Sequence, residues 1–390
     1  MKTAGIVAEY NPFHPGHAFH IARTRELLGP ETAVVAVMSG NWVQRGECAL
    51  FDKWTRAGMA LEGGADLVLE LPSVWAVSSA EGFARGAVEI LAASGVVEAL
   101  SFGSECGVLS PLRELAQCLN SPAFSRALRQ ELDPKRSFAL SRRQAAARLL
   151  GEERARLLDL PNNSLGVEYL RFLPAGMEAV TVPRRGAGHD SGAERDGFPS
   201  ASLLRRRARE EYMTGESALQ SVPHREPADM RWLERAVIAR LRGMSLEEVQ
   251  ALPDSGGGLA ARLLSAARET TGLEELYALT KTRSYTHSRV RRLVLCALLG
   301  LREQDRPAAP PYIRVLGFNR RGQALLREMN TKAALPFFVK AAHIHNARRF
   351  SPAARALFQL EERCTDLYAL CFPTPHPSGL EWTTNPVLLP

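Results

Sequence analysis

Residues 9–17 (EYNPFHPGH) combine side chains and backbone that could bind a reacting phosphate. His14 and His17 are three residues apart, and imidazole N–H groups can stabilise the charge that grows on a transferring phosphoryl group. Gly16 between them lets the backbone come close to a ligand. The segment ends an apolar strand and opens a helix, where free N–H groups and the helix dipole attract phosphate. This context favours a phosphate-binding loop, with His14 and His17 as catalytic residues, over a turn with two surface histidines.

Other basic and glycine residues are further candidates for nucleotide contacts. Lys53 and Arg56 lie one helical turn apart, so one helix face could present both to phosphates, and Lys53 is added to the predicted catalytic residues. The alternative for this pair is a solvated helix face. Gly103 closes an expected strand and permits close approach to adenine or ribose, the alternative being an ordinary turn. Arg184 follows another expected strand, at residues 179–182, where a guanidinium could bind phosphate bidentately, and its neighbour Arg185 is an equal candidate.

Residues 281–292 (KTRSYTHSRVRR) contain five basic residues and no acidic one, with a tyrosine among them. Phosphate-binding charge together with a stacking ring suits RNA, and the alternative is a solvated face. The predicted tRNA-binding residues are Lys281, Arg283, Tyr285, Arg289, Arg291 and Arg292. By contrast, His343 and His345 have no third ligand at a plausible spacing, so no metal site is predicted.

The elements that must position these residues follow a regular pattern in the first hundred residues. Short apolar segments of strand composition recur about every 30 residues, and helix-length segments separate them. The strands are expected at residues 4–9, 33–38, 66–71 and 97–102, and the helices at residues 17–28, 52–62 and 81–93. Apolar strands that alternate with helices predict a doubly wound α/β domain with a parallel sheet. Ligands of this fold bind beyond the carboxyl ends of the strands, so the loops that follow the four strands should converge on one site.

Composition and charge bound the class of protein. The chain has 390 residues, of which 45% are hydrophobic and 23% charged, as is typical of a folded globular protein. It has no apolar run of the roughly 18 residues that a membrane span requires, no signal-peptide pattern, and six scattered cysteines without a C-x-x-C pair. A cytoplasmic protein is therefore predicted. Residues 1–110 hold 7 basic and 12 acidic side chains, and residues 111–390 hold 42 basic and 30 acidic side chains. This asymmetry suits a polyanion partner for the second part of the chain. The alternative is that the basic charge has no functional meaning, because basic proteins are common.

Seven sequence blocks follow one another along nearly the whole chain. They are GIVAEYNPFHPGH, MSGNWVQRGECALFDKWTR, GADLVLELP, SAEGFARGAV, FGSECG, PNNSLGVEYL and TKTRSYTHSRVRRL. The H-x-G-H motif of the first block is similar to that of the nucleotidyltransferase superfamily, which includes the class I aminoacyl-tRNA synthetases. Together the blocks resemble the bacterial tRNA(Met) cytidine acetate ligase family. The resemblance implies that ATP, with Mg²⁺, and acetate give acetyl-adenylate and pyrophosphate, and that the acetyl group passes to N4 of the wobble cytidine of elongator tRNA(Met).

The resemblance also implies a set of ATP-binding residues. Asn162 and Asn163 could cap the helix that follows Pro161, but in the family an asparagine there contacts the nucleotide. Residues 200–205 resemble the superfamily's second signature, whose hydroxyls and helix N–H groups hold the β- and γ-phosphates; Ser202 stands where threonine is frequent. The implied ATP-binding residues are Val7, Ala8, Glu9, Tyr10, Asn11, Pro12, Phe13, His14, Pro15, Gly16, His17, Ala18, Phe19, His20, Gly103, Asn162, Asn163, Arg184, Arg185, Ser200, Ser202 and Arg205. The candidates for binding acetate are Asn41, Gln44 and Arg45, on the loop after the second strand.

Two domains are predicted on this basis. Residues 1–212 form a doubly wound, Rossmann-like nucleotidyltransferase domain that binds ATP and has a helical insertion at about residues 108–160. Residues 213–390 form a mainly helical, basic domain that binds tRNA, with a further strand at residues 312–318.

Two other functions remain open from the sequence. One is a small-molecule adenylyltransferase, but such enzymes are usually much shorter, and the basic helical half would then lack a purpose. The other is a nucleotide-sensing RNA-binding protein without catalysis, against which the intact His14, Gly16, His17 and Lys53 argue. The expected partners are elongator tRNA(Met) and acetate, and neither a membrane nor a stable protein partner is expected.

Overall fold

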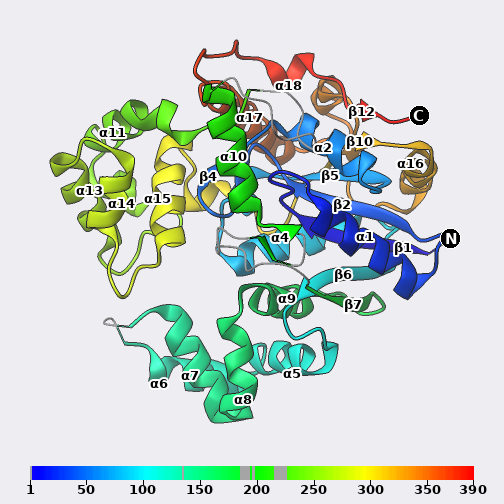
Figure 1. The fold of residues 1–390 in the computed structure, drawn as a ribbon, viewed down its shortest axis with the longest axis horizontal. Coiled ribbons are helices and arrows are strands. Elements are labelled where there is room, and N and C mark those ends of the chain that lie inside the picture. The colour runs from blue at the N-terminus through cyan, green and yellow to red at the C-terminus, as the bar shows by residue number, and fades with distance from the viewer. Residues whose placement is uncertain (1, 134–135, 185–193, 196–197, 215–225) are drawn as a thin grey trace.

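A sheet of eight strands forms the centre of the chain (Figure 1). The computed structural model describes residues 2–133, 136–184, 194–195, 198–214 and 226–390. The parallel part of the sheet consists of β1 (Thr3–Ala8), β2 (Ala33–Ser39), β5 (Leu67–Leu71), β6 (Ala99–Ser104) and β7 (Glu178–Pro183). Their spatial order is β5-β2-β1-β6-β7, which places the switch in strand order between β1 and β6. The predicted doubly wound parallel sheet is confirmed.

The sheet is buried on both faces, which explains its nearly continuous apolar strands. Alternate residues of a strand point to opposite faces. In β2, Val34, Ala36 and Met38 belong to one apolar cluster, and Val35 and Val37 belong to the other. Helices on the two faces cover these clusters. They are α1 (Pro15–Leu28), α2 (Lys53–Glu62), α4 (Ala80–Ala93), α9 (Pro161–Phe172) and α16 (Arg320–Lys332).

The last part of the chain completes one edge of the sheet. The strand β10 (Ile313–Phe318) pairs antiparallel with β5, and β11 (Phe337–Phe338) and β12 (Val387–Leu388) pair with β10. The sequence predicts β10, but not its place beside β5, and it misses β11 and β12 because each has only two residues. Part of the predicted second domain therefore shares the sheet of the first, and the division at residue 213 stays a prediction.

Helices between β6 and β7 form a lobe at the bottom of Figure 1. The lobe consists of α5 (Leu109–Leu119), α6 (Pro122–Glu131), α7 (Phe138–Leu150), α8 (Glu152–Ala155) and the short η1 (Arg156–Asp159). It lies where the sequence predicts helices. Its apolar side chains Leu112, Leu115 and Phe124 pack into the same cluster as the sheet residues.

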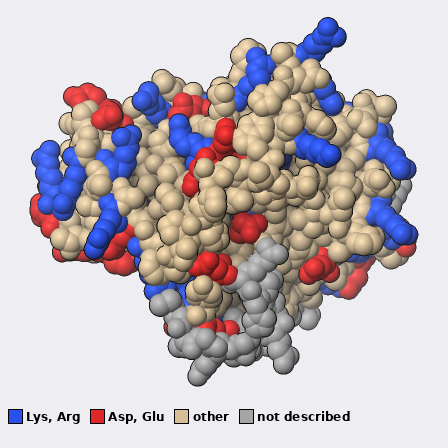
Figure 2. Space-filling model, turned by 90° about the horizontal axis from the view of Figure 1, so that it is seen from above, with Lys and Arg blue, Asp and Glu red and all other residues tan. Residues whose placement is uncertain are grey.

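A second group of helices lies to the left of the sheet in Figure 1. After α10 (Ala201–Thr214), the group contains α11 (Glu234–Arg242), α12 (Leu246–Gln250), α13 (Leu259–Glu269), α14 (Leu273–Thr280) and α15 (His287–Leu299). Figure 2, a view from above, shows basic and acidic side chains interspersed on the left side of the molecule. Within the described ranges, every helix is too short or too polar to cross a membrane.

One further long helix, α17, and several short elements complete the chain. They are α3 (Ser73–Ala76), α17 (Pro352–Tyr368), α18 (Leu380–Thr383), β3 (Trp42–Val43), β4 (Glu47–Cys48), β8 (Glu194–Arg195), β9 (Phe198–Pro199), η2 (Met230–Leu233), η3 (Glu303–Asp305) and η4 (Ala341–His345).

Candidate nucleotide-binding site

The loop between β1 and α1 fixes both histidines of the H-x-G-H motif. His14 is the N-cap of α1, which begins two residues earlier than predicted, and its Nδ1 accepts a hydrogen bond of 3.0 Å from the N–H of Gly16. Nδ1 of His17 accepts one of 3.2 Å from the N–H of His14. Because each Nδ1 is an acceptor, the proton of each neutral ring lies on Nε2, which leaves Nε2–H as a donor. The two ring centroids are 3.8 Å apart, so both donors belong to one small region.

Gly16 is required by this arrangement. A Cβ at residue 16 would lie 2.8 Å from Cε1 of His14, closer than side-chain carbons approach. The glycine between the two histidines thus allows the close packing of the two tilted rings, in addition to the backbone approach that the sequence predicts.

A cavity of about 1060 Å³ opens at the carboxyl ends of the strands and is lined by this loop. Most of the predicted ATP-binding residues line it. They are Val7, Ala8, Glu9, Tyr10, Asn11, His14, Gly16, His17, Phe19, His20, Gly103, Asn162, Arg184, Ser200 and Arg205. Other predicted residues do not line it, namely Pro12, Phe13, Pro15, Ala18, Asn163 and Ser202. Arg185 lies outside the described residues.

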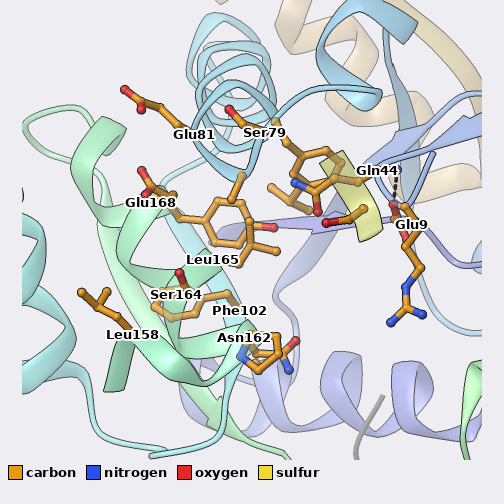
Figure 3. A pocket seen from close by; sticks show the side chains of 18 of the residues that line it. Glu9, Gln44, Ser79, Glu81, Phe102, Leu158, Asn162, Ser164, Leu165 and Glu168 are labelled. Atoms are coloured by element: carbon orange, nitrogen blue, oxygen red, sulfur yellow. Dashed lines mark hydrogen bonds between the residues drawn. The ribbon is translucent and has the colours of Figure 1, made fainter. Parts of the chain in front are cut away.

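The wall opposite the histidine loop comes from α4 and α9 and from the insertion. Figure 3 shows Ser79 and Glu81 at the start of α4, and Asn162, Leu165 and Glu168 of α9, across the cavity from Glu9 and Gln44. Sequence reasoning misses the apolar residues of this wall, such as Phe124 and Leu158. Their spacing is that of core residues, and no local signal distinguishes a cavity wall from a core.

The loop from β3 to β4 brings two of the three acetate candidates to the cavity. Gln44 and Arg45 line it, and the N–H of Gln44 donates a hydrogen bond of 2.7 Å to Oε1 of Glu9 (Figure 3). Burial raises the pKa of Glu9, against the lowering effects of this hydrogen bond and of Arg45. Asn41 is buried elsewhere, where its Oδ1 accepts from the N–H of Lys53, so the structure does not support it as an acetate ligand.

The two asparagines after Pro161 have different positions. Oδ1 of Asn163 accepts hydrogen bonds from the N–H groups of Glu105 and Cys106, at 2.9 and 3.1 Å, and this residue is fully buried. Oδ1 of Asn162 accepts from Nη1 of Arg184, and both side chains line the cavity. Asn162 and Arg184 are therefore the better nucleotide candidates.

Neither asparagine caps α9 through its side chain, so the alternative interpretation of Asn162 and Asn163 as helix caps is wrong. The carboxylate of Glu105 accepts from the N–H groups of Asn162 and Asn163, at 3.0 and 2.7 Å. Glu105 follows Gly103 closely in sequence, but the sequence gives no sign that it reaches the start of a helix 57 residues later.

The start of α10 contacts the histidine loop directly. Nη1 of Arg205 donates a hydrogen bond of 2.9 Å to the carbonyl oxygen of Asn11, so this arginine connects the two parts of the predicted phosphate site. Ser200 caps the helix by accepting from the N–H of Leu203. Ser202 instead accepts from Nη2 of Arg205 and lies off the cavity wall, which argues against the predicted phosphate contact.

The structure argues against the predicted phosphate contacts of Lys53 and Arg56, because the first turn of α2 faces the core and not solvent. Lys53 is 1% exposed, and its Nζ donates to Oε1 of Glu70 at 2.6 Å and to Glu381. Arg56 is buried and donates to the carbonyl oxygens of Glu9 and Phe51. Neither lines the cavity, so the structure argues against a catalytic Lys53; Arg56 instead holds the backbone at the end of β1.

The predicted tRNA-binding run lies partly at the same cavity. Arg289 and Arg292 line it, whereas Lys281 and Arg283 are exposed nearby in sequence. Arg289 donates to the carbonyl oxygens of Asp254 and Gly256 at 2.8 and 2.9 Å. The remaining two members also have partners, since Tyr285 donates to Gly257 and Arg291 lies 3.3 Å from Glu274.

His20 should make the free energy of unfolding depend on pH. Burial, together with the charge of Arg184, lowers the pKa of His20 from 6.5 to about 4, and its Nε2 lies 3.0 Å from Oγ of Ser101. The unfolded chain therefore binds a proton between pH 6.5 and 4 that the folded chain does not. We expect His20 to reduce the free energy of unfolding as the pH falls through this interval, by at most about 1.4 kcal/mol per pH unit.

Urea unfolding of wild type and His20→Gln at several pH values measures this contribution. Glutamine keeps a hydrogen-bonding group beside Ser101 but does not titrate, so the variant should lose the extra slope. Identical slopes for the two proteins would contradict the assignment.

Comparisons with known proteins agree with this geometry. The family model described as HIGH Nucleotidyl Transferase matches residues 1–381. A tRNA(Met) cytidine acetate ligase from Syntrophomonas wolfei is 36% identical, with 99% of each chain covered, and one from Caldanaerobacter subterraneus is 37% identical, with 95% of this chain and 96% of the relative covered.

Solved structures are similar over the whole chain. Thermotoga maritima TmcAL without ligand superposes with a TM-score of 0.93 at 31% identity, and TmcAL bound with alpha-thio ATP with a TM-score of 0.91 at 31% identity. Each comparison covers 100% of both chains. The chain belongs to the tRNA(Met) cytidine acetate ligase family of HIGH nucleotidyl transferases.

Proposed function

We propose that this protein activates acetate with ATP and transfers the acetyl group to N4 of the wobble cytidine of elongator tRNA(Met). The observation that carries the proposal is one cavity lined both by the H-x-G-H loop and by Arg289 and Arg292 of the basic run. A nucleotide and an RNA could therefore meet in the same space. The relatives named as tRNA(Met) cytidine acetate ligases support the choice of substrates.

In the first step an acetate oxygen attacks the α-phosphorus of ATP. A new P–O bond forms, the bond to the β-phosphate breaks, and pyrophosphate leaves. Nε2–H of His14 and His17 would stabilise the charge that develops on the phosphoryl oxygens. Arg205 and Arg184 would bind the phosphates from the other sides, and Gln44 and Arg45 are the remaining candidates for acetate.

In the second step N4 of cytidine attacks the carbonyl carbon of acetyl-adenylate. The C–N bond forms, the C–O bond to AMP breaks, and a proton is released from N4. Because this amine is a weak nucleophile, positioning is a large part of the catalytic task. A base must leave its stack to reach an enclosed site, as in other base-modifying enzymes.

Mg²⁺ would enter the site with ATP, because the phosphates of ATP bind it. Among the described residues, no group of three or more His, Cys, Asp or Glu side chains could bind a metal by itself. The carboxylate of Glu9 at the cavity wall is an oxygen ligand of the kind that Mg²⁺ takes in addition to phosphate and water. A tRNA substrate also favours the cytoplasm as the location.

Labelled acetate tests the function directly. We expect enzyme, ATP and [14C]acetate to label elongator tRNA(Met), and replacement of its wobble cytidine by uridine to abolish the label. Uridine has an oxygen at C4 where cytidine has an amine, so it offers no nucleophile. Binding should change far less, because phosphate contacts ignore base identity. N4-acetylcytidine in the digested tRNA is the product to detect by mass spectrometry.

The same assay separates the two alternatives. Label in a small molecule, with tRNA unlabelled, would indicate an adenylyltransferase with another acceptor. RNA binding without any ATP-dependent labelling would indicate a protein without catalysis.

The basic run gives a prediction for tRNA affinity. Alanine at Lys281, Arg283 and Arg291 should weaken tRNA binding and reduce the slope of log K against log salt by roughly 0.7–0.9 for each lost phosphate contact. Filter binding over a salt series measures it. The control is alanine at Arg320, Arg321 and Arg327 of α16, which removes the same charge at the opposite side of the sheet in Figure 1. Equal slopes for both triple variants would move the tRNA surface elsewhere, for instance to Arg206, Arg207 and Arg209.

A further inference from the structure

The middle part of the helical insertion is basic. Residues 121–150 contain seven Lys and Arg side chains and two Asp and Glu side chains. Arg129 of α6 is exposed and forms no hydrogen bond or ion pair with any residue in the described ranges. Arg136, just before α7, is 46% exposed at its side chain, and its partners among the described residues are the half-buried Asp133 and Gln144. Such charges are available to a polyanion.

The insertion and the basic run face the same cavity. Ser125 and Leu128 of α6 and Ser137 and Phe138 at the start of α7 line it. Across the cavity, Ser284, Thr286, Ser288 and Arg289 at the start of α15 line it as well. The two helical lobes thus form opposite walls of a space that continues to His14 and His17.

Phe138 is the exposed aromatic side chain of this wall. It is 56% exposed, whereas Phe124 of the same lobe is buried in the core cluster. The cavity lining also includes the apolar side chains of Leu128, Leu158 and Leu165, together with the ion pair of Arg142 and Glu168. An exposed ring on the cavity wall, in a lobe that also carries exposed cationic side chains, fits an unstacked base on a phosphate backbone.

We propose that the insertion binds a single-stranded RNA loop, with Phe138 stacking on a base and Arg129 and Arg136 contacting phosphates. This inference rests on the proposed function, because it makes α6 and α7 the second wall that holds the anticodon loop against residues 281–292. A double helix does not offer the unstacked bases that an aromatic side chain can bind, so the occupant is a loop. The shared cavity then leads the splayed nucleotide to the adenylate.

Binding of an RNA hairpin with the anticodon stem and loop of elongator tRNA(Met) tests the proposal. Phe138→Ala should weaken binding by roughly 5- to 150-fold, the range for losing one base–aromatic stack, and Phe138→Trp should restore it. Alanine at Arg129 and Arg136 should reduce the salt slope by roughly 0.7 for each contact. Alanine at Arg320 and Arg327 of α16 removes the same charge away from the cavity and should leave the slope unchanged.

Separate outcomes overturn the two proposals. Wild-type affinity and salt slope in the insertion variants, with tRNA still acetylated by wild type, would contradict the role of the insertion and leave the ligase function intact. Loss of ATP–pyrophosphate exchange with hairpin binding unchanged would assign this wall to the nucleotide and also contradict it. Absence of any tRNA acetylation by wild type would instead contradict the ligase function.

Discussion

Replacing His14 or His17 by alanine should lower acetate-dependent ATP–pyrophosphate exchange by at least tenfold, and by 10²–10³-fold if each acts as a full charge-stabilising donor. Each ring uses Nδ1 as an acceptor for loop backbone, so the proton of the neutral ring is on Nε2, and both residues line the cavity. The two rings lie close together at a tilt of 32°, so the loss of either removes one of two neighbouring donors. Exchange measured with saturating ATP and acetate reports this step without tRNA.

A second substitution separates chemistry from helix capping. His14 caps α1, so alanine also removes the cap. Asparagine is among the best N-cap residues, and His14→Asn should keep the thermal stability of wild type while losing exchange as alanine does. Wild-type exchange in both alanine variants would exclude these histidines from the reaction.

Replacing Lys53 by methionine should lower the free energy of unfolding by about 3–5 kcal/mol, the range for removing one partner of a buried ion pair. The ammonium lies between Glu70 and Glu381, both almost fully buried, and Arg314 also contacts them. Although burial disfavours the charged form of Glu381, Arg314 and Lys53 lower its pKa to about 2. Without Lys53 this cluster keeps two carboxylates and one cation.

Denaturant unfolding measures this loss, and an exposed lysine provides the control. Lys332 pairs with Glu328 on the surface of α16, and because exposed ion pairs contribute little, Lys332→Met should leave the free energy of unfolding nearly unchanged. Unchanged stability of Lys53→Met, together with a loss of pyrophosphate exchange, would restore the catalytic role that the sequence predicts for Lys53.

Local sequence was sufficient to predict the central sheet and the histidine loop. The strands β1, β2, β5 and β6 alternate with helices because apolar segments and glycine stops recur in order, and these signals act over a few residues. His14, Gly16 and His17 are contiguous with β1, so their place at the carboxyl end of a strand follows from the chain itself. The start of α1 lies two residues before the predicted one, because His14 caps the helix by accepting the N–H of Gly16, and histidine is not a usual cap residue.

Tertiary structure decided which polar residues face the cavity. Lys53 and Arg56 have the spacing of a solvated or phosphate-binding helix face, yet β10 and the C-terminal helices cover that face. The partner of Lys53, Glu381, is 328 residues further along the chain, and no pattern near Lys53 encodes it. In the same way, Phe138 has an ordinary place in the apolar pattern of α7, and only the packing of the two helical lobes leaves it exposed at a shared cavity. Sequence periodicity determines which residues lie on one face of an element, but what that face meets depends on contacts between segments far apart in the chain.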